Sequence, residues 1–385
     1  MKILFIQPCY KGYGGYYRSL GMAHGLTYRK HYVDLLISHK QNDLTIKKIK
    51  ENKYLQTILL PRLNLHPYVN GKILRGLIAC LYILIGNYDV IHVFESVQFE
   101  SNLPLILCMI LNKKVVLDID EEWQASLPYI KSKGLIHKYI YWCDVNLVKK
   151  FSHLVVTSDY LLQKYTRLGV PCVLKIINGT ENTNRKKISQ PNARKKFPIA
   201  NSEKMILSIG NTFAGQRAIL LYETFFELYK LDSSIKLYTN INLVKTLKEN
   251  GYSKKVDSNV INNITNTGYL SNKQLALYLA ATNLTLFVSG SENSEKACYP
   301  IRIGTYLSAN KVIAINQVPT ETFNSLKPYN CTISGSTAKD LALNIHNYFI
   351  NICWQKKLQL NTYKAKKKLC WNNLAKQLNI FYQTL

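Results

Sequence analysis

The chain has 385 residues, of which 47% are hydrophobic and 19% are charged, a composition that excludes intrinsic disorder and collagen-like or low-complexity architectures. Because a single core stops growing near about 250–300 residues, the length indicates two domains. Fifty lysines and arginines against 23 acids give a formal net charge of +27, which favours anionic partners: phosphorylated substrates, an acidic membrane surface or nucleic acid.

Nine cysteines are scattered along the chain without a C-x-x-C pair or the spacing of a zinc site. We interpret them as reduced thiols of a cytosolic protein. The apolar run before Gln7 is too short for a signal peptide. The most apolar later segment, 73–85, contains Arg75 and falls short of the roughly 20 residues that span a bilayer. We therefore predict no transmembrane helix.

The first half opens with a strand, a glycine loop and a helix. Residues 2–6 predict a short buried strand, and the loop after them leads to an amphipathic helix over 16–26, the opening of a doubly wound α/β unit. Further strands, separated by segments of helical length, are predicted at 32–37, 90–94, 115–117 and 154–157. This alternation predicts a parallel sheet with right-handed crossovers.

The second half repeats this opening. A polar, basic stretch with prolines ends at Glu203 and predicts a connector between domains. A strand over 205–209, a glycine-flanked loop and a helix over 218–230 follow it. Further strands are predicted at 235–238, 284–288 and 312–315. Apolar residues at helical spacing predict a closing helix near the end of the chain. We therefore predict an α/β protein with two Rossmann-like halves.

Short segments along most of the chain resemble motifs of the family-4 glycosyltransferases, in the order in which that family has them. The matching segments are Gly14-Gly15 with Arg18, Asp89-Val90-Ile91-His92, Val155-Val156-Thr157-Ser158, Asn178-Gly179, Gly210 through Arg217, Gly268-Tyr269-Leu270-Ser271, and Pro300-Ile301-Arg302 with Tyr306-Leu307. The resemblance implies a GT-B fold: two Rossmann-like domains that face each other across a cleft. The acceptor-side domain would span 1–182 and the nucleotide-sugar domain 183–352, and C-terminal helices over 353–385 would return to the first domain.

The resemblance also implies an activity. The enzyme would transfer a hexose from a UDP- or GDP-linked sugar to a glycan or lipid-linked acceptor, with retention, as a step of polysaccharide biosynthesis. The nucleotide-sugar would be a co-substrate, and neither a metal nor another cofactor is expected. We expect a cytoplasmic protein with peripheral attachment to the inner face of the membrane. A basic nucleic-acid-binding protein is the alternative that the charge permits, but the paired α/β halves argue against it and no nucleic-acid partner is expected.

A departing nucleoside diphosphate gains negative charge, so its site needs cations or backbone N–H groups. Arg217 stands at the lysine position of the family's phosphate loop, before a helix whose N–H groups would assist. Arg302 follows Pro300, where the family has a cation that faces the phosphates. We expect both arginines to be catalytic. The alternative for Arg217 is a solvated side chain at the start of a helix.

The donor site departs from the family in several places. The two glutamates of the E-x7-E motif fall on Ala297 and Thr305, and a threonine offers one hydroxyl where a carboxylate binds two ribose hydroxyls. Glu292 and Glu295 on the preceding loop could substitute for them, or could be surface charges. Lys296 on the same loop faces either the phosphates or solvent. These departures keep open a catalytically inactive GT-B partner subunit.

Three further residues complete the expected donor site. Gly210 is the glycine of the phosphate loop, and Asn211 replaces the arginine that often follows it. Arg217 would therefore carry more of the phosphate binding. The resemblance also assigns Tyr269 to the donor site.

Acids follow the predicted strand at 115–117, at the edge where ligands bind in open α/β sheets. We expect Asp120 to contact the transferred sugar or the acceptor hydroxyl, where many relatives have a histidine, with Asp118 and Glu121 behind it. One alternative is a solvated acidic loop. Another is the Asp-x-Asp metal motif of the other large glycosyltransferase fold, but that fold has one nucleotide domain.

The first glycine loop does not match a dinucleotide site, because Tyr17 stands at the third glycine of G-x-G-x-x-G. The N–H groups of Gly14 and Gly15 could meet the donor phosphate or the acceptor, or the pair could only form a tight turn. We interpret His92 as a core histidine. The helix that contains Lys72 and Arg75 faces either the membrane or the sheet.

Overall fold

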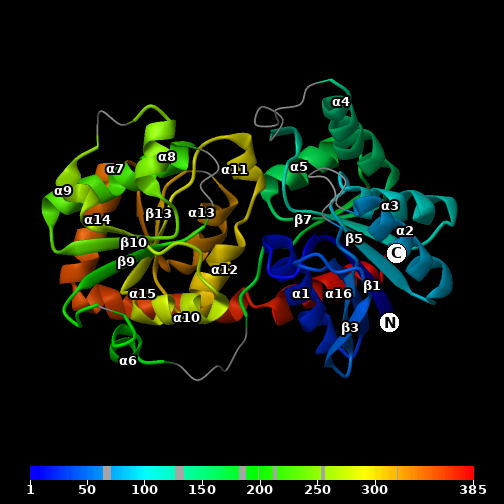
Figure 1. Cartoon of the computed structure of the whole chain (residues 1–385), viewed down its shortest axis with the longest axis horizontal. Coiled ribbons are helices and arrows are strands. Elements are labelled where there is room, and N and C mark those ends of the chain that lie inside the picture. Colours follow the sequence, from blue (N-terminus) through cyan, green and yellow to red (C-terminus); the bar gives the residue numbers. More distant parts are fainter. Residues whose placement is uncertain are drawn as a thin grey trace. The chain divides into compact units, whose positions relative to one another are not determined.

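The computed structural model describes residues 1–63, 71–125, 134–181, 188–197, 199–210, 215–252, 256–318 and 320–385. The chain forms two compact units, each built on a largely parallel sheet (Figure 1). The first unit contains Met1–Gly179, Lys296–Ile301 and Cys370–Leu385, and the second contains Thr180–Glu295 and Arg302–Leu369. The predicted pair of Rossmann-like halves is confirmed.

The first unit has an eight-stranded sheet in the order β3-β4-β2-β1-β5-β6-β7-β8. Its strands are β1 (Lys2–Tyr10), β2 (Tyr32–Ser38), β3 (Lys47–Asn52), β4 (Leu55–Leu60), β5 (Val90–Phe94), β6 (Val115–Ile119), β7 (His153–Val156) and β8 (Cys172–Lys175). Neighbouring strands are parallel except β3 and β4, which form an antiparallel hairpin. The sequence analysis did not predict this hairpin, because β3 is a polar edge strand without an apolar run.

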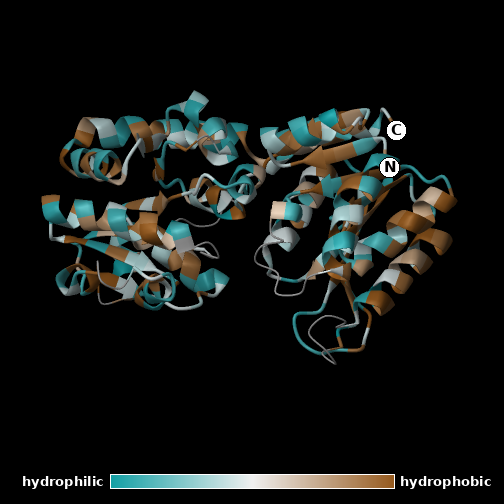
Figure 2. Ribbon diagram, turned by 90° about the horizontal axis from the view of Figure 1, so that it is seen from above, coloured by the Kyte–Doolittle hydropathy of each residue, from teal (hydrophilic) through white to brown (hydrophobic). Residues whose placement is uncertain are grey.

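Helices cover both faces of this sheet. They are α1 (Gly14–Thr27), α2 (Lys72–Ile85), α3 (Phe99–Ile110), α4 (Leu135–Tyr141), α5 (Asp159–Arg167) and α16 (Trp371–Tyr382), with a π-helical turn over Trp142–Leu147 and a 3₁₀ turn over Val148–Lys150. Successive strand residues point to opposite faces. Leu4 and Ile6 accordingly share a hydrophobic core with Ala79 and Ile83 of α2. The interior strands are strongly hydrophobic, whereas the helices mix hydrophobic and hydrophilic residues (Figure 2).

Helix α16 packs on α1 through two glycines. A Cβ atom at Gly21 would overlap the Trp371 ring, and one at Gly25 would overlap Ala375 and the backbone of Trp371. Trp371, Leu374 and Leu378 are buried in this contact. Because the two helices approach so closely, residues without a side chain are needed on α1. The last segment of the chain therefore belongs to the first unit.

The second unit has a six-stranded parallel sheet in the order β11-β10-β9-β12-β13-β14. Its strands are β9 (Lys204–Ser208), β10 (Ile235–Thr239), β11 (Ile264–Asn266), β12 (Leu284–Phe287), β13 (Ile313–Asn316) and β14 (Thr332–Gly335). Its helices are α6 (Gln190–Arg194), α7 (Gly215–Leu231), α8 (Leu243–Glu249), α9 (Ser258–Ile261), α10 (Asn272–Ala281), α12 (Ile301–Ser308), α13 (Glu321–Leu326), α14 (Ala338–Ile350) and α15 (Ile352–Lys368), with a 3₁₀ turn over Lys327–Tyr329. Helix α11 (Asn293–Ala297) crosses the boundary between the units.

The chain returns to the first unit after Leu369. The sequence led us to expect this return near residue 353. Helix α15 belongs to the second unit because Leu358 is buried in the core of that unit. Among the described residues, no helix is both long and apolar enough to cross a membrane.

Candidate functional site

The loop after β9 in the second unit brings together two residues of the expected donor site. Arg302, at the start of α12, donates a hydrogen bond from Nη1 to the Ile209 carbonyl at 3.1 Å. Gly210 has a φ of +136°, and a Cβ atom there would overlap the Arg302 guanidinium. Both the backbone conformation and the close arginine therefore require glycine at this position.

Tyr306 anchors the same loop. Its phenol accepts a hydrogen bond from the Ile209 N–H at 2.8 Å and lies 3.2 Å from the Ile209 carbonyl. The Gly210 N–H donates to Asn240 Oδ1 at 2.8 Å. Tyr306 belongs to a segment that resembles a family motif, and the structure shows that it holds the loop in place.

The two expected catalytic arginines share one aromatic ring. The guanidinium carbons of Arg217, in the first turn of α7, and Arg302 each lie 5.6 Å from the centroid of the Phe287 ring. A cation over a ring face is stabilised by the ring quadrupole. Phe287 ends β12, so both cations lie at the carboxyl edge of the sheet, where ligands bind in this architecture. Phe287 was not predicted, although it ends an apolar strand.

Carboxylates accompany these cations. Arg217 forms a close ion pair with the buried carboxylate of Glu295, so part of its charge is compensated within the protein. Burial raises the pKa of Glu295, while the Arg217 charge opposes the shift. Glu292 Oε2 is buried and has no hydrogen-bond partner in the part of the chain that the structure describes. A buried acceptor of this kind is costly unless a donor reaches it.

The remaining expected donor residues are less closely gathered. Tyr269, just beyond β11, is 80% exposed, and Thr305 is half-buried on α12. Lys296, on α11, belongs to the first unit, whereas Glu295 belongs to the second. Asn211 lies outside the described residues.

Ala297 cannot be replaced by the first glutamate of the family motif without rearrangement. It is fully buried in the hydrophobic core of the first unit. Its carbonyl accepts a hydrogen bond from Thr157 Oγ1 at 3.2 Å. A carboxylate at this position would be buried among apolar side chains, which is costly without a charge partner.

In the first unit, Asp118 lies inside β6 and is 1% exposed. Its two oxygens accept hydrogen bonds of 2.9 Å from Nε and Nη2 of Arg18, which is also fully buried. Burial opposes ionisation, but the Arg18 charge and the His92 hydrogen bond keep the pKa of Asp118 below its ordinary value. Asp118 is therefore half of a buried ion pair behind Asp120, and its expected part in the acceptor site stays a prediction.

His92 completes this buried network, which confirms its interpretation as a core histidine. Its Nδ1 lies 2.6 Å from the Tyr382 hydroxyl and its Nε2 3.4 Å from Asp118 Oδ2. Burial lowers the pKa of His92. Arg18 also donates to the Ile176 carbonyl and to Asn178 Oδ1. The network thus ties α1, β5, β6 and α16 together.

Asp120, just beyond β6, is partly buried and forms no ion pair with any described residue. Burial raises the pKa of Asp120 to about 6, and the nearby Asp118 charge adds to the shift while Arg18 opposes it. The Asp120 carbonyl accepts a hydrogen bond from Thr157 Oγ1 at 3.0 Å, which holds the backbone. A carboxylate that titrates near neutral pH suits general acid–base chemistry.

Glu95 is a candidate that the sequence analysis missed. It follows β5 with a φ of +60°, a conformation that is strained for a residue with a side chain. Its N–H donates to the Asp118 carbonyl at 2.8 Å. Burial first, and then the charges of Asp120 and Glu121, raise the pKa of Glu95 well above its ordinary value of 4.5. The rule that selected Asp120, an acid directly after a buried strand, also selects Glu95.

The two expected glycines of the first loop differ. A Cβ atom at Gly15 would lie 2.8 Å from Nε2 of Gln7, which donates to the Gly15 carbonyl at 2.9 Å. Gly15 therefore permits a structural contact. Gly14 begins α1, is exposed, and would have no atom within 4 Å of a Cβ. Glu121 is also exposed. No group of three or more potential metal-ligating side chains occurs in the described ranges.

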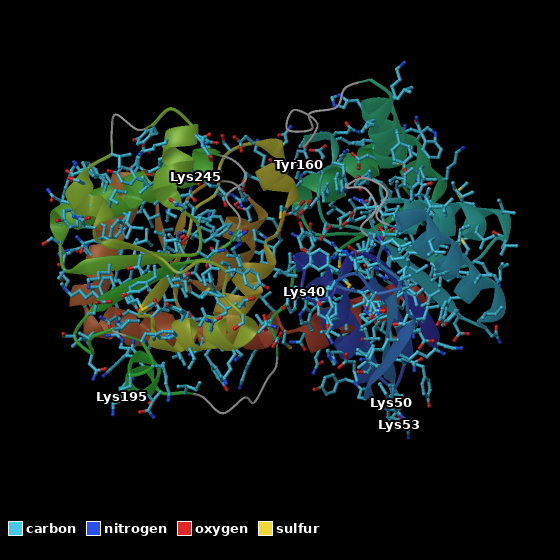
Figure 3. The ribbon with its side chains drawn as sticks, in the orientation of Figure 1. Lys40, Lys50, Lys53, Tyr160, Lys195 and Lys245 are labelled. Carbon is cyan, nitrogen blue, oxygen red and sulfur yellow. The ribbon has the colours of Figure 1, made fainter. Side chains whose placement is uncertain are left out.

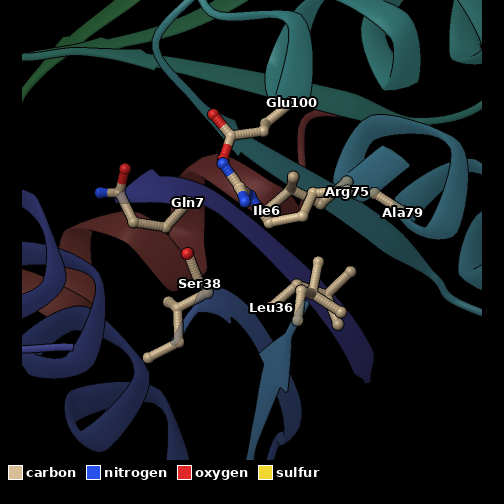
Figure 4. A pocket seen from close by; sticks show the side chains of 9 residues that line it. Ile6, Gln7, Leu36, Ser38, Arg75, Ala79 and Glu100 are labelled. Atoms are coloured by element: carbon tan, nitrogen blue, oxygen red, sulfur yellow. The ribbon is translucent and has the colours of Figure 1, made fainter. Parts of the chain in front are cut away.

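A small cavity beside β1 is not a substrate site. The side chains of Gln7, Ser38, Arg75 and Glu100 are among those that line it (Figure 4). Its volume is about 10 Å³, whereas ligand pockets are on the order of 300–1,000 Å³. Arg75 forms a buried ion pair with Glu100 and donates to the Pro61 carbonyl. This arginine therefore lies in the interior and does not face a membrane.

No protein-family description and no curated protein sequence matches the chain. Solved structures match its fold over nearly the whole chain. A sucrose-phosphate synthase from Thermosynechococcus elongatus is 16% identical, with a TM-score of 0.70 over 100% of this chain and 98% of that one. WaaG, a glycosyltransferase involved in lipopolysaccharide biosynthesis, is 12% identical, with a TM-score of 0.65 over 98% of both chains.

A third solved structure, described as trehalose-6-phosphate from E. coli bound with UDP-2-fluoro glucose, is 11% identical. Its TM-score is 0.65 over 100% of this chain and 99% of that one. Such likeness at low identity establishes the fold, and the chain has the GT-B fold.

Proposed function

We propose that the protein is a glycosyltransferase that moves a hexose from a UDP- or GDP-linked donor to a glycan or lipid-linked acceptor, with retention. The observation that carries the proposal is the pair of arginines on Phe287 beside the Gly210 loop, at the carboxyl edge of the second sheet of a GT-B fold. The UDP-sugar in one of the similar solved structures supports a nucleotide-sugar donor.

In this proposal the second unit binds the donor. Arg217 and Arg302 stabilise the charge that develops on the departing diphosphate. Gly210 has no side chain, so the Arg302 guanidinium can lie directly against the loop backbone. The first N–H groups of the 17-residue helix α7 add partial positive charge. No step of this scheme requires a metal ion.

The donor ribose requires hydrogen-bond acceptors. Glu292 fits this role best, because its buried Oε2 atom has no partner among the described residues and two ribose hydroxyls can donate to one carboxylate. Glu295 forms an ion pair with Arg217 and competes with the donor phosphates for its charge. Glu292 thus takes over the function of the missing family glutamate, with the Thr305 hydroxyl as a second contact.

The first unit acts on the transferred sugar and the acceptor. Asp120 contacts the sugar or accepts a hydrogen bond from the acceptor hydroxyl, and Glu95 on the neighbouring strand shares this acidic edge. Above a pH of about 6 Asp120 is ionised, so it stabilises positive charge on the sugar at neutral pH. Its carboxylate is available because no described residue forms an ion pair with it.

A catalytically inactive GT-B subunit is the second candidate, and the buried Ala297 is the observation that favours it. The two functions differ in a simple measurement. An active enzyme hydrolyses or transfers the sugar of its donor, whereas an inactive subunit binds the nucleotide without turnover.

Donor binding is tested by thermal shift with UDP, GDP, ADP and their sugars. A ligand at a hundredfold excess over its Kd stabilises the folded state by about 2.7 kcal/mol. We expect UDP or GDP to raise the melting temperature, and Arg302→Ala to reduce the rise. Transfer or hydrolysis of the selected nucleotide-sugar, measured with and without EDTA, then tests turnover without metal. No shift with any nucleotide would refute the proposal.

We further propose peripheral attachment of the first unit to an anionic membrane on the cytoplasmic side. Helix α2 exposes an apolar stripe in which Leu77, Leu81 and Leu84 are each more than 50% exposed. Lys113 and Lys114, which follow the adjacent α3, are exposed cations. Apolar insertion and attraction to anionic lipid act together in such surfaces.

Vesicle flotation tests the membrane proposal. The protein should bind phosphatidylglycerol vesicles more than phosphatidylcholine vesicles, and salt should weaken the binding. Leu81→Glu should reduce it, whereas Leu343→Glu, at an apolar position of the second unit that is 47% exposed, should not. Equal binding to both lipids at low salt would contradict the proposal.

A further inference from the structure

A larger pocket lies at the opposite edge of the first sheet, where β1, β2 and β4 begin. Its volume is about 360 Å³, within the range of small-molecule sites. The β3–β4 hairpin forms one wall, and Lys50 and Lys53 lie on it (Figure 3). Nine residues of β1, at about 3.3 Å each, place this pocket roughly 26 Å from the carboxyl edge that carries Asp120.

The pocket is strongly positive. Lys2, Lys50 and Lys53 line it, and no described acid forms an ion pair with any of them. Its one acid is Asp34, whose carboxylate accepts a hydrogen bond from the Tyr88 hydroxyl at 2.8 Å. Three lysines and one carboxylate leave an excess of positive charge, which favours an anionic ligand.

Two tyrosines add a second kind of recognition. The rings of Tyr32 and Tyr54 are 5.0 Å apart and meet edge to face at 65°. Tyr32 is 51% exposed, so part of its ring is available to a ligand. An aromatic ring buries the apolar C–H face of a pyranose, and the Gln56 amide also lines the pocket and can bond hydroxyls.

We propose that this pocket binds an anionic saccharide, in which the lysines pair with carboxylate or phosphate groups and Tyr32 packs on a sugar ring. A concave site of this size suits one or two sugar residues better than a flat bilayer or an extended nucleic-acid backbone. If the proposed glycosyltransferase activity holds, the pocket retains a part of an acidic acceptor glycan remote from the reacting end. Binding itself does not depend on that activity.

Calorimetric titration of the full-length protein tests this site with three probes. Hyaluronan hexasaccharide carries both carboxylates and sugar rings, maltohexaose carries sugar rings without charge, and linear polyphosphate carries charge without sugar. We expect hyaluronan to bind at least tenfold more tightly than maltohexaose. If polyphosphate binds as tightly as hyaluronan and is equally sensitive to every variant, the site is only a basic surface and the proposal is wrong.

Variants locate the binding. Lys50→Ala with Lys53→Ala should weaken hyaluronan binding about tenfold, since exposed ion pairs contribute modestly to affinity. Tyr32→Ala should weaken hyaluronan binding about fivefold and leave polyphosphate binding unchanged. Lys195→Ala removes an equally exposed lysine from the second unit (Figure 3) and should change nothing. Unchanged hyaluronan binding in the pocket variants would overturn the proposal.

The same variants separate this inference from the proposed function. All pocket variants should retain the thermal shift produced by UDP or GDP, because the pocket lies in the first unit. Loss of glycan binding with nucleotide binding intact supports the pocket. Nucleotide binding without any hyaluronan binding overturns the pocket alone, and hyaluronan binding without nucleotide binding overturns the glycosyltransferase alone.

Discussion

The carboxyl edges of the two sheets have the same architecture but carry different charged groups. In the first unit, Glu95, Asp120 and Glu121 gather at the ends of β5 and β6. In the second unit, Arg217 and Arg302 lie on the ring that ends β12. The parallel sheet supplies an edge where ligands bind, but the residues after each strand decide what binds. The acids of the first unit can accept a proton from a hydroxyl group, and the arginines of the second unit can bind a diphosphate.

The two edges also differ in whether their charged side chains have ion-pair partners within the protein. Arg217 is paired with Glu295, whereas Glu95 and Asp120 form no ion pair with a described cation, and burial raises the pKa of both. Groups held in such costly states concentrate at functional sites. Removal of individual charges at each edge tests this difference.

Asp120→Asn should have the largest effect on activity. It preserves shape while it removes the charge from the acidic edge, so turnover should fall roughly 10²–10⁴-fold. Nucleotide affinity, measured by thermal shift, should hardly change because the arginines belong to the other unit. Full activity in this variant would show that Asp120 is only a surface charge.

Asp118→Asn, two residues away, should affect stability instead. It breaks the buried pair with Arg18, and removal of one partner of a buried ion pair costs about 3–5 kcal/mol. Denaturant unfolding should show this loss, with Asp120→Asn as the matched control. Because the pKa of Asp118 is lowered in the folded state, its contribution is lost as pH falls. Equal stability of both variants would contradict this division of roles.

Arg302→Ala and Arg217→Ala should each lower turnover on the order of 10²-fold, as the loss of one oxyanion-stabilising donor does. Arg302→Lys keeps the charge but loses the planar fork that bonds the Ile209 carbonyl, so an intermediate loss is expected. Initial rates with a saturating donor measure these effects. Near-normal turnover in both alanine variants would remove the arginines from the site.

The pH dependence should report Asp120. Since burial raises its pKa to about 6, kcat/KM should fall as pH drops below 6, by up to about tenfold per pH unit. Between pH 4 and 6 Asp120 keeps its proton in the folded protein, whereas in the unfolded chain it has already lost the proton, because its ordinary pKa is 3.8. The free energy of unfolding should therefore decrease as pH rises from about 4 to 6, and less so in Asp120→Asn. If kcat/KM does not fall below pH 6, the assignment of Asp120 as the titrating group is wrong.

Glu295→Gln should have the smallest effect. Because the carboxylate competes with the donor phosphates for Arg217, its neutralisation should tighten UDP or GDP binding about threefold. The tightening should disappear in the double variant with Arg217→Ala. If Glu295→Gln instead weakens nucleotide binding, the ion pair holds Arg217 in position for the phosphates and does not compete with them.

Local sequence was sufficient for the alternation of strands and helices, the two halves, the glycine at position 210 and the acids after β6, because strand periodicity and loop chemistry act over a few residues. It placed both Asp118 and Asp120 in the expected acceptor site. Both stand in one short acidic motif, and only the tertiary structure pairs Asp118 with Arg18, 100 residues away, and leaves Asp120 at the edge.

The tertiary structure also decided features that no local pattern carries. The Phe287 ring under two arginines, the strained Glu95 and the packing of Trp371 on Gly21 each join segments far apart in the chain. No local pattern carries the antiparallel β3–β4 hairpin either, or the basic pocket of which it forms one wall. Local propensity determines which elements form, whereas burial and charge pairing between distant elements determine which side chains remain available for a ligand.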